Sequence, residues 1–250
     1  MSIESLLLSI AMATAAGLVG CFALMRRMSL AADALSHVAL PGIGVALALG
    51  ISPMFGAAAM LFFGALLVWS VEGKSGVGTE AVIGVLFSVA LAVGSMTTSG
   101  EELIEALFGG APALTVPEML FGFAAAAAVI AVIITQRHRL VVSLVSSDVA
   151  RMAGVNVRRL NLLYLEMFAL TIALGLRYLG VLLMGALVII PAATAKRLAG
   201  NLTAVLTTAV ALSIAATLGG TGLANRLHQQ SGPLIVIIAA AFFLLSFLRP

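Results

Sequence analysis

The chain has 250 residues, of which 62% are hydrophobic and only 9% are charged, and its mean hydropathy is +1.20. A soluble domain carries about 25% charged residues, so this composition excludes a water-facing surface over most of the chain and indicates an integral membrane protein. The net charge of +3 is not gathered in a basic run with interleaved aromatic residues, which argues against binding to nucleic acid.

The first apolar segment, residues 3–25, is expected to be a retained membrane span. Its stretch LVGC (18–21) resembles a lipoprotein cleavage site. A signal peptide needs a positive amino-terminal region, however, and residues 1–20 contain no Lys or Arg. Cys21 is the only cysteine of the chain, which excludes a disulfide framework and any CxxC motif.

Windows of about 20 mostly apolar residues, the length that a membrane-crossing helix needs, predict nine spans. An alternative treats residues 161–195 as one bent element and lowers the count to eight. No segment outside the spans is long enough for a second domain, so we expect one all-α polytopic domain over residues 1–250. The predicted spans cover residues 3–25, 30–50, 53–71, 80–98, 118–136, 161–176, 180–195, 201–221 and 232–248.

The distribution of Lys and Arg predicts the orientation. When the loop after the first span is cytoplasmic, every Lys and Arg except Arg177 and Arg226 lies on the inner side, as expected for cytoplasmic loops. The amino terminus is then outside and the carboxyl terminus is cytoplasmic. The outer loop after the fourth span is acidic, and its Glu101, Glu102 and Glu105 either attract cations to an outer mouth or are ordinary solvated charges.

The second span begins with AADALSHVALPG (31–42), which places Asp33 and His37 four residues apart and therefore on one helix face. Ionisable groups inside a span are costly and are usually functional or paired. Two interpretations stay open from the spacing alone. The pair can be a metal site, because carboxylate and imidazole suit zinc, manganese or ferrous iron. Alternatively, Asp33 is favoured by the helix dipole and His37 forms a hydrogen bond within the bundle.

The longest inner segment, residues 136–161, predicts a short cytoplasmic helix. Ser146, Ser147 and Asp148 are residue types that cap helix amino termini, DVARMA follows as a helix, and Gly154 ends it. A loop that only connects two spans does not need a capped helix. A loop that docks against a partner protein needs a rigid surface, so docking is the favoured function of this segment.

Three further residues carry weaker signals. Glu166 lies in the sixth span and is either a second pathway ligand or, as the favoured interpretation, a side chain that reaches the inner surface or pairs with Arg158 or Arg159. His228 is expected in an external loop, where receiving metal is a minor alternative. Pro191 is expected to kink the seventh span.

Several blocks of the sequence resemble one family, the membrane permeases of bacterial ATP-binding-cassette importers for zinc, manganese or iron. The blocks occur in the family's order and cover most of the chain. One departure is VEGKSGVGTE (71–80), which has more glycine and less charge than the family has before its fourth span. The blocks are MRRMSLAADALSHVALPGIGVALALG (25–50), AVIGVLFS (81–88), SSDVARMAGVNVRRLNLL (146–163), LGVLLMGALVIIPAATAKRL (179–198) and SGPLIVIIAAAFFLL (231–245).

The resemblance implies a type II importer fold in the bacterial inner membrane and a homodimer of this chain. It also implies two cytoplasmic ATPase subunits and an external metal-binding protein that delivers the ion. No resident cofactor is expected, and the transported ion is Zn²⁺, Mn²⁺ or Fe²⁺. Within the cytoplasmic segment 137–160, residues 146–156 correspond to the coupling helix, whose expected contacts with the ATPase are Asp148, Val149, Ala150, Met152, Ala153 and Gly154.

The family associates its Asp-x-x-x-His pattern with metal passage, and this pattern falls on Asp33 and His37. On a two-fold axis, two copies of each residue would converge. The turn RRMSL (26–30) and the loop 71–80 are the expected cytoplasmic gate, and a helix near 101–108 corresponds to the outer gate elements.

Two other functions compete with this interpretation. An ATP-independent secondary transporter or channel for divalent cations would explain the acidic mouth and the Asp–His pair, but it leaves the capped cytoplasmic helix unexplained, and no inverted repeat is evident. An intramembrane enzyme would need HExxH, a Ser–His pair or two facing aspartates, and only one aspartate lies near a span. There is also no GxxxxGK[ST] motif, so we expect no catalytic centre here and ATP hydrolysis on a separate chain.

Overall fold

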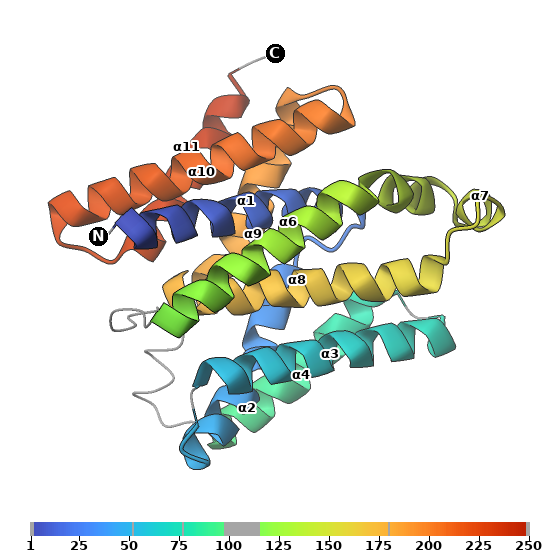
Figure 1. Cartoon of the computed structure of the whole chain (residues 1–250), viewed down its shortest axis with the longest axis horizontal. Coiled ribbons are helices and arrows are strands. Elements are labelled where there is room, and N and C mark those ends of the chain that lie inside the picture. Colours follow the sequence, from blue (N-terminus) through green and yellow to red (C-terminus); the bar gives the residue numbers. More distant parts are fainter. Residues whose placement is uncertain (1–2, 52, 77, 98–115, 180, 249–250) are drawn as a thin grey trace.

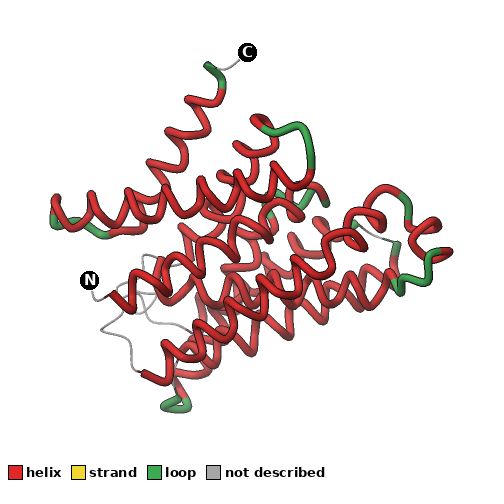
Figure 2. The backbone as a smooth tube through the Cα atoms, turned by 45° about the horizontal axis from the view of Figure 1, so that its top comes forward, coloured by secondary structure: helices red, strands yellow, loops and turns green. Residues whose placement is uncertain are grey.

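The computed structural model describes residues 3–51, 53–76, 78–97, 116–179 and 181–248 (Figure 1). Helices joined by short turns make up this part of the chain, and the turns gather at the ends of the bundle (Figure 2). The helices of the described residues are α1 (Ile3–Met25), α2 (Ala31–Ala48), α3 (Pro53–Ser75), α4 (Thr79–Thr97), α6 (Val116–Val145), α7 (Ser147–Met152), α8 (Val157–Leu179), α9 (Val181–Leu198), α10 (Leu202–Leu227) and α11 (Ser231–Ser246).

Each of the nine expected spans corresponds to one helix of this structure. Seven helices are long and apolar enough to cross a membrane on these two criteria alone, namely α1, α2, α3, α4, α6, α8 and α10. The other two, α9 and α11, have 18 and 16 residues. The protein is therefore an all-helical membrane protein with seven to nine candidate spans. Helix α8 ends at Leu179 and α9 begins at Val181, with only residue 180 outside the described residues between them, so the alternative of one bent element over 161–195 also stays open.

One boundary differs from its expected position by more than two turns. The fifth span was expected to end at residue 136, but α6 continues through QRHRLVVSLV to Val145. Arg, Gln and Leu are good helix formers, so the helix continues after its apolar stretch has ended. The loop that follows is shorter than expected and contains little besides α7 and the turn before α8.

Small residues let the helices approach closely, as is usual where lipid removes the hydrophobic drive for helix association. A Cβ atom added to Gly20 of α1 would overlap the Val188 carbonyl of α9. One added to Gly17 would lie 3.1 Å from the Ala209 carbonyl oxygen of α10. Among the seven described helices that are long and apolar enough to cross a membrane, α1 is the most buried, and it packs against α6, α9 and α10.

Helix α2 packs on α3, α4 and α9. Its contact with α3 is backbone to backbone, since a Cβ at Gly42 would overlap the Gly56 carbonyl and a Cβ at Gly56 would overlap the Gly42 carbonyl. Helix α7 lies at one end of the bundle, in the turn between α6 and α8 (Figure 1). We refer to this end, where α1, α3 and α9 finish and α4, α8 and α10 begin, as the α7 end.

Candidate functional site

The structure brings Asp33 and His37 to one face of α2, as the spacing predicts. Asp33 is in the first turn of α2, where the helix dipole favours a negative charge, and it is exposed. His37 is half-buried, and its ring makes an edge contact with Phe87 of α4 at a centroid distance of 5.3 Å. The His37 Nδ1 atom is buried without a hydrogen-bond partner. This pattern disagrees with a histidine that is fully satisfied within the bundle.

One copy of the chain does not complete a metal site at this face. Among the described residues, no three His, Cys, Asp or Glu side chains gather closely enough to hold an ion. Asp33 and His37 supply two ligand groups, whereas zinc sites generally need four, at least three of them from protein in catalytic sites. The pair therefore supplies too few ligand groups for a zinc site, and any further ligands would have to approach from the exposed side of Asp33.

The opposite side of α2 is closed by glycine contacts that fix the position of Asp33. A Cβ added to Gly185 of α9 would lie 3.0 Å from both the Cα and the backbone nitrogen of Asp33. The Gly42–Gly56 contact with α3 holds the next part of the helix. The Asp33 backbone is thus held against α9 while its carboxylate remains exposed.

Helix α4, which lies beside His37, presents an uncovered surface to its surroundings. Val85, Val89 and Met96 are exposed by 68%, 56% and 87%. A Cβ added to Gly84 on this helix would meet no atom within 4 Å. No described helix of this chain covers the surface, which leaves it available to lipid or to a second copy of the chain.

The two turns expected to form the cytoplasmic gate are joined by hydrogen bonds at the α7 end. Arg26, directly after α1, donates to the Asn161 side-chain carbonyl on α8. Asn161 Nδ2 donates to Glu72 Oε2 of α3 at 2.9 Å, and Thr79 Oγ1 of α4 donates to Glu72 Oε1 at 2.7 Å. The Arg26 guanidinium also lies 4.3 Å from the centroid of the Tyr164 ring. We call Arg26, Asn161, Glu72 and Thr79 the inner polar network.

The charge of Arg26 is held in a partly dehydrated position. Burial lowers the pKa of Arg26 from its ordinary value, and the nearby Tyr164 and Glu72 oppose this effect. The guanidinium nevertheless stays protonated, because arginine does not lose its proton in proteins. Its Nε is buried without a hydrogen-bond partner. The inner polar network therefore compensates a positive charge that would otherwise lie uncompensated between α1 and α8.

A second contact ties the start of α8 to α3. Trp69 Nε1 donates to the Arg158 backbone carbonyl at 2.9 Å, and the Arg158 guanidinium lies 4.5 Å from the centroid of the Trp69 ring. The expected pairing of Glu166 with Arg158 or Arg159 is absent from the described part of the chain. Glu166 is half-buried, and its Oε2 has no hydrogen-bond partner.

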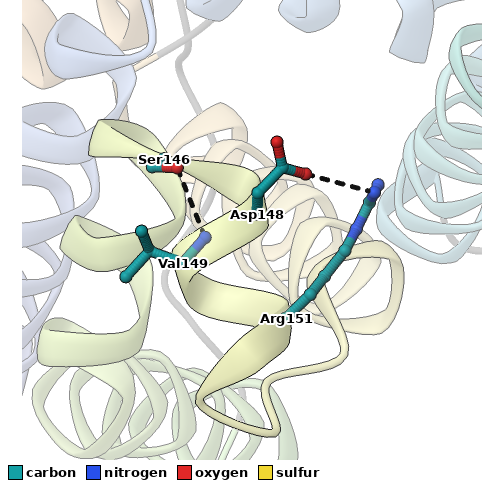
Figure 3. Close-up of polar contacts among 4 residues, drawn as sticks. All are labelled: Ser146, Asp148, Val149 and Arg151. Carbon is teal, nitrogen blue, oxygen red and sulfur yellow. Dashed lines mark hydrogen bonds and ion pairs between the residues drawn. The ribbon is translucent and has the colours of Figure 1, made fainter.

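The expected cytoplasmic helix is present as α7 (Figure 3). Ser146 caps it, because its side-chain oxygen accepts a hydrogen bond from the Val149 amide at 3.3 Å. Asp148 and Arg151 form an exposed ion pair at 3.6 Å, and Gly154 ends the segment with a φ of +77°. This confirms the prediction of a helix that is capped near Ser146 and ends before Gly154.

The helix α7 has one anchored side and one exposed apolar side. Ala150 is fully buried, whereas Val149 and Met152 are exposed by 56% and 89%. Val145, just before the cap, is exposed by 83%. Ala153 is also exposed and completes the segment before Gly154. Apolar side chains presented by a fixed short helix suit contact with a partner protein.

The remaining expected site residues are the three glutamates of the outer loop and His228. Glu101, Glu102, Glu105 and the helix near 101–108 lie outside the described residues. His228 ends α10 in a left-handed conformation with φ of 52°, and it is exposed. Sequence reasoning missed Asn161 and Trp69; the signals were an amide in the first turn of a span and the single tryptophan of the chain.

Comparisons with known proteins agree with this arrangement. The model of the ABC 3 transport family matches residues 1–250. A manganese import system permease protein, ScaB of Streptococcus parasanguinis, is 30% identical over 98% of this chain and 89% of its own. The high-affinity zinc uptake system membrane protein ZnuB of Haemophilus influenzae is 27% identical over 92% of this chain and 90% of its own.

A solved structure is also similar over nearly the whole chain. PsaBC from Streptococcus pneumoniae in complex with Fab matches with a TM-score of 0.83 and 29% identity, covering 98% of this chain and 90% of that one. The fold is that of a type II importer permease, as the sequence resemblance implies. The chain belongs to the ABC 3 transport family, the non-catalytic multi-pass membrane permeases of bacterial ATP-binding-cassette importers for manganese, zinc and iron.

Proposed function

We propose that two copies of this chain form the permease of an importer and pass Mn²⁺, Zn²⁺ or Fe²⁺ between their α2 helices. Asp33 and His37 of each copy would contact the ion in transit. ATP hydrolysis would occur on separate cytoplasmic ATPase subunits, and an external metal-binding protein would deliver the ion. The amino terminus would face outward, so that the α7 end with its Lys and Arg residues faces the cytoplasm.

The observation that carries this proposal is the open pair on α2. His37 Nδ1 has no hydrogen-bond partner and Asp33 is exposed, although both belong to a helix that is apolar enough to cross a membrane. A two-fold axis at this face would add a second Asp33 and a second His37. Two carboxylates and two imidazoles provide four ligand groups, which a single chain lacks among its described residues.

The choice of ion follows from the ligand types and from the relatives. Carboxylate and imidazole suit manganese, zinc and ferrous iron, whereas copper(I) prefers sulfur ligands. The only cysteine, Cys21, is buried on α1, where its thiol faces the Val205 carbonyl. Conduction also needs a site weak enough to release its ion. A site assembled from two half-sites, one on each chain, fits that requirement better than a closed cage would.

Helix α7 would carry the ATPase contact. Asp148, Val149, Met152, Ala153 and Gly154 would lie in a groove of that subunit, while the buried Ala150 holds the helix to the permease. Closure of the ATPase pair would then move α7. The Trp69–Arg158 contact would pass this movement to α3, and the inner polar network would pass it to α1 and α4. On the other side, Glu101, Glu102 and Glu105 would attract cations to the mouth.

Metal uptake by cells tests the proposal. Cells lacking their own importers would co-express this chain with its neighbouring ATPase and binding protein and be given radiolabelled manganese, zinc or iron. Asp33→Ala and His37→Ala should each lower uptake at least tenfold while the purified complex keeps its size. His138→Ala is the matched control, because this histidine is exposed near the end of α6 and outside the proposed pathway.

Two outcomes would overturn the proposal. Full uptake by both α2 variants would make the pair a structural feature, and the pathway would then lie elsewhere in the bundle. Full uptake by the wild-type chain without its ATPase would instead favour the ATP-independent transporter or channel. The identity of the accumulated radiolabel decides among the three metals.

A further inference from the structure

A cavity of about 330 Å³ lies at the α7 end between the last turns of α6 and the start of α8. Its polar lining comes from Gln136 and Arg139 of α6, Asn156 before α8, and Arg159 in the first turn of α8. Leu160 and Leu163 of α8 provide an apolar part. Ala153, Gly154 and Val155 complete the lining, so the cavity borders the segment after α7 that is proposed to contact the ATPase. The cavity is separate from the α2 face, and its polar lining residues belong neither to the proposed metal pathway nor to the proposed ATPase contact.

The cavity has a positive charge without a protein counterion. Arg139 donates only to the Gln136 side-chain oxygen at 3.3 Å, and no acceptor on described residues is found for the Arg159 guanidinium. No acidic residue is part of the lining. The side chain of Asn156 accepts the Arg159 amide and so caps α8, whose amino terminus adds a partial positive charge. Two guanidinium groups and a helix amino terminus together favour an anion, and arginine matches phosphate geometry well.

The position of the cavity along the membrane normal indicates which anion can reach it. The long apolar stretch of α6 ends at Thr135 and is followed by QRHR. About 20 residues suffice to cross the hydrocarbon layer, so we place Gln136 and Arg139 at the level of the headgroups. The two leucines lie deeper along α8 than Arg159. The cavity therefore combines a cationic part at headgroup level with an apolar part toward the membrane, which matches the two ends of a lipid. Basic pockets between spanning helices on the cytoplasmic side are known to bind anionic headgroups.

We infer that the Arg139–Arg159 cavity binds the phosphate headgroup of an anionic phospholipid. One lipid molecule would bridge α6 and α8 just where these helices lead into and out of α7. It would thereby hold the two supports of α7 at a fixed separation. The permease would need this lipid for efficient coupling to its ATPase, and the requirement is independent of which metal is carried.

The test uses the intact complex of the permease with its ATPase, purified and stripped of lipid. Short-chain phosphatidylglycerol, short-chain phosphatidylcholine and free glycerol phosphate are titrated separately, and bound molecules are counted by native mass spectrometry. We expect one saturable phosphatidylglycerol per permease chain and no comparable binding of the other two. Arg139→Gln combined with Arg159→Gln should weaken phosphatidylglycerol binding at least tenfold. Arg137→Gln should not, because Arg137 neighbours the site in sequence but is outside the cavity lining.

A second measurement separates lipid binding from general damage. In nanodiscs, ATPase activity should rise with the phosphatidylglycerol fraction for the wild type and for Arg137→Gln, and should be flat for the double variant. If glycerol phosphate binds as well as phosphatidylglycerol, the ligand is a soluble phosphate and the proposal of a lipid is wrong. Binding only after the ATPase is removed would show that the ATPase occupies the cavity. Unchanged phosphatidylglycerol binding by the double variant would place the lipid elsewhere.

Discussion

The polar groups of the inner polar network have hydrogen-bond partners, whereas those on the exposed face of α2 differ in this respect. In the network, Glu72 accepts hydrogen bonds through both carboxylate oxygens, and Asn161 links this carboxylate to Arg26. On α2, the His37 Nδ1 has no partner, and Asp33 remains exposed. Polar groups within an apolar chain are costly unless they are satisfied. The satisfied set holds helices together, whereas on α2 the unpartnered His37 nitrogen and the exposed Asp33 carboxylate are the groups that the proposed metal pathway would use.

The contrast also applies to the two sides of α2 itself. Its back is closed by contacts of Gly42 with Gly56 and of Gly185 with Asp33, which allow almost no added volume. Its front carries the open pair. Three substitutions test this contrast. One lies at the back of α2, one lies in the inner polar network, and one lies at the cap of α7, outside both regions.

The largest expected effect comes from Gly56→Ala. The new methyl group would overlap the Gly42 carbonyl and would lie 2.6 Å from Ala46 Cβ, so α2 and α3 would have to separate. We expect a loss of stability of about 3 kcal/mol, the upper part of the range for overpacked sites. A lower thermal midpoint of the complex in detergent, with loss of uptake, would report it.

Gly222→Ala on α10 is the matched control, because its new methyl group meets no atom within 4 Å. It should keep the wild-type midpoint or raise it slightly, since alanine favours a helix over glycine. A Gly56→Ala protein with an unchanged midpoint would show that the back of α2 is looser than the Gly42–Gly56 contact implies.

A smaller effect is expected from Asn161→Ala in the inner polar network. The change removes the acceptor of Arg26 and the donor to Glu72, leaving the Arg26 charge partly buried without its acceptor. We expect a loss of about 2 kcal/mol, typical of a broken hydrogen bond to a charged group. The thermal midpoint measures it, and Asn225→Ala, at an exposed position on α10, should change little.

A double variant sharpens this result. Because Asn161 and Glu72 share a hydrogen bond, Glu72→Ala added to Asn161→Ala should cost less than the sum of the two single changes. Strictly additive losses would mean that the network is a set of independent contacts and does not act as a unit.

The smallest expected effect on stability comes from Ser146→Ala. This change removes the cap of α7 and should cost about 1 kcal/mol locally. A helix of six residues has little stability of its own, so amide exchange in α7 should become faster while the thermal midpoint of the bundle stays nearly constant. Ser147→Ala is the control, and equal exchange rates in the two variants would rule out the Ser146 cap as the stabilising contact.

Most of the fold could be predicted from sequence because apolar runs of about 20 residues mark spans almost directly. All nine expected spans correspond to helices, and α7 could be predicted from the Ser146 cap and Gly154. The end of α6 could not, since the polar QRHR after Thr135 interrupts the apolar pattern, whereas its Gln and Arg residues still favour a helix.

The site could be predicted only where its residues are close in sequence. Asp33 and His37 share a helix face at a spacing of four, so the pattern alone brings them together. The inner polar network could not be foreseen, because its members lie on α3, α4, α8 and the turn after α1, and their contacts depend on how these helices pack. For the same reason, the contact of Arg158 with Trp69 could not be foreseen, whereas the sequence offered Arg158 or Arg159 as one of the possible partners of Glu166.

The length of α6 has a consequence for the proposed contact between α7 and the ATPase. Its 30 residues extend about 45 Å at 1.5 Å each, and a tilt of about 20° still leaves roughly 42 Å along the membrane normal. The hydrocarbon layer is about 30 Å thick, so the last turns of α6 project into water and carry α7 clear of the oily interior. The proposed ATPase subunit would therefore contact α7 in water, without entering the lipid or losing its hydration against the bilayer.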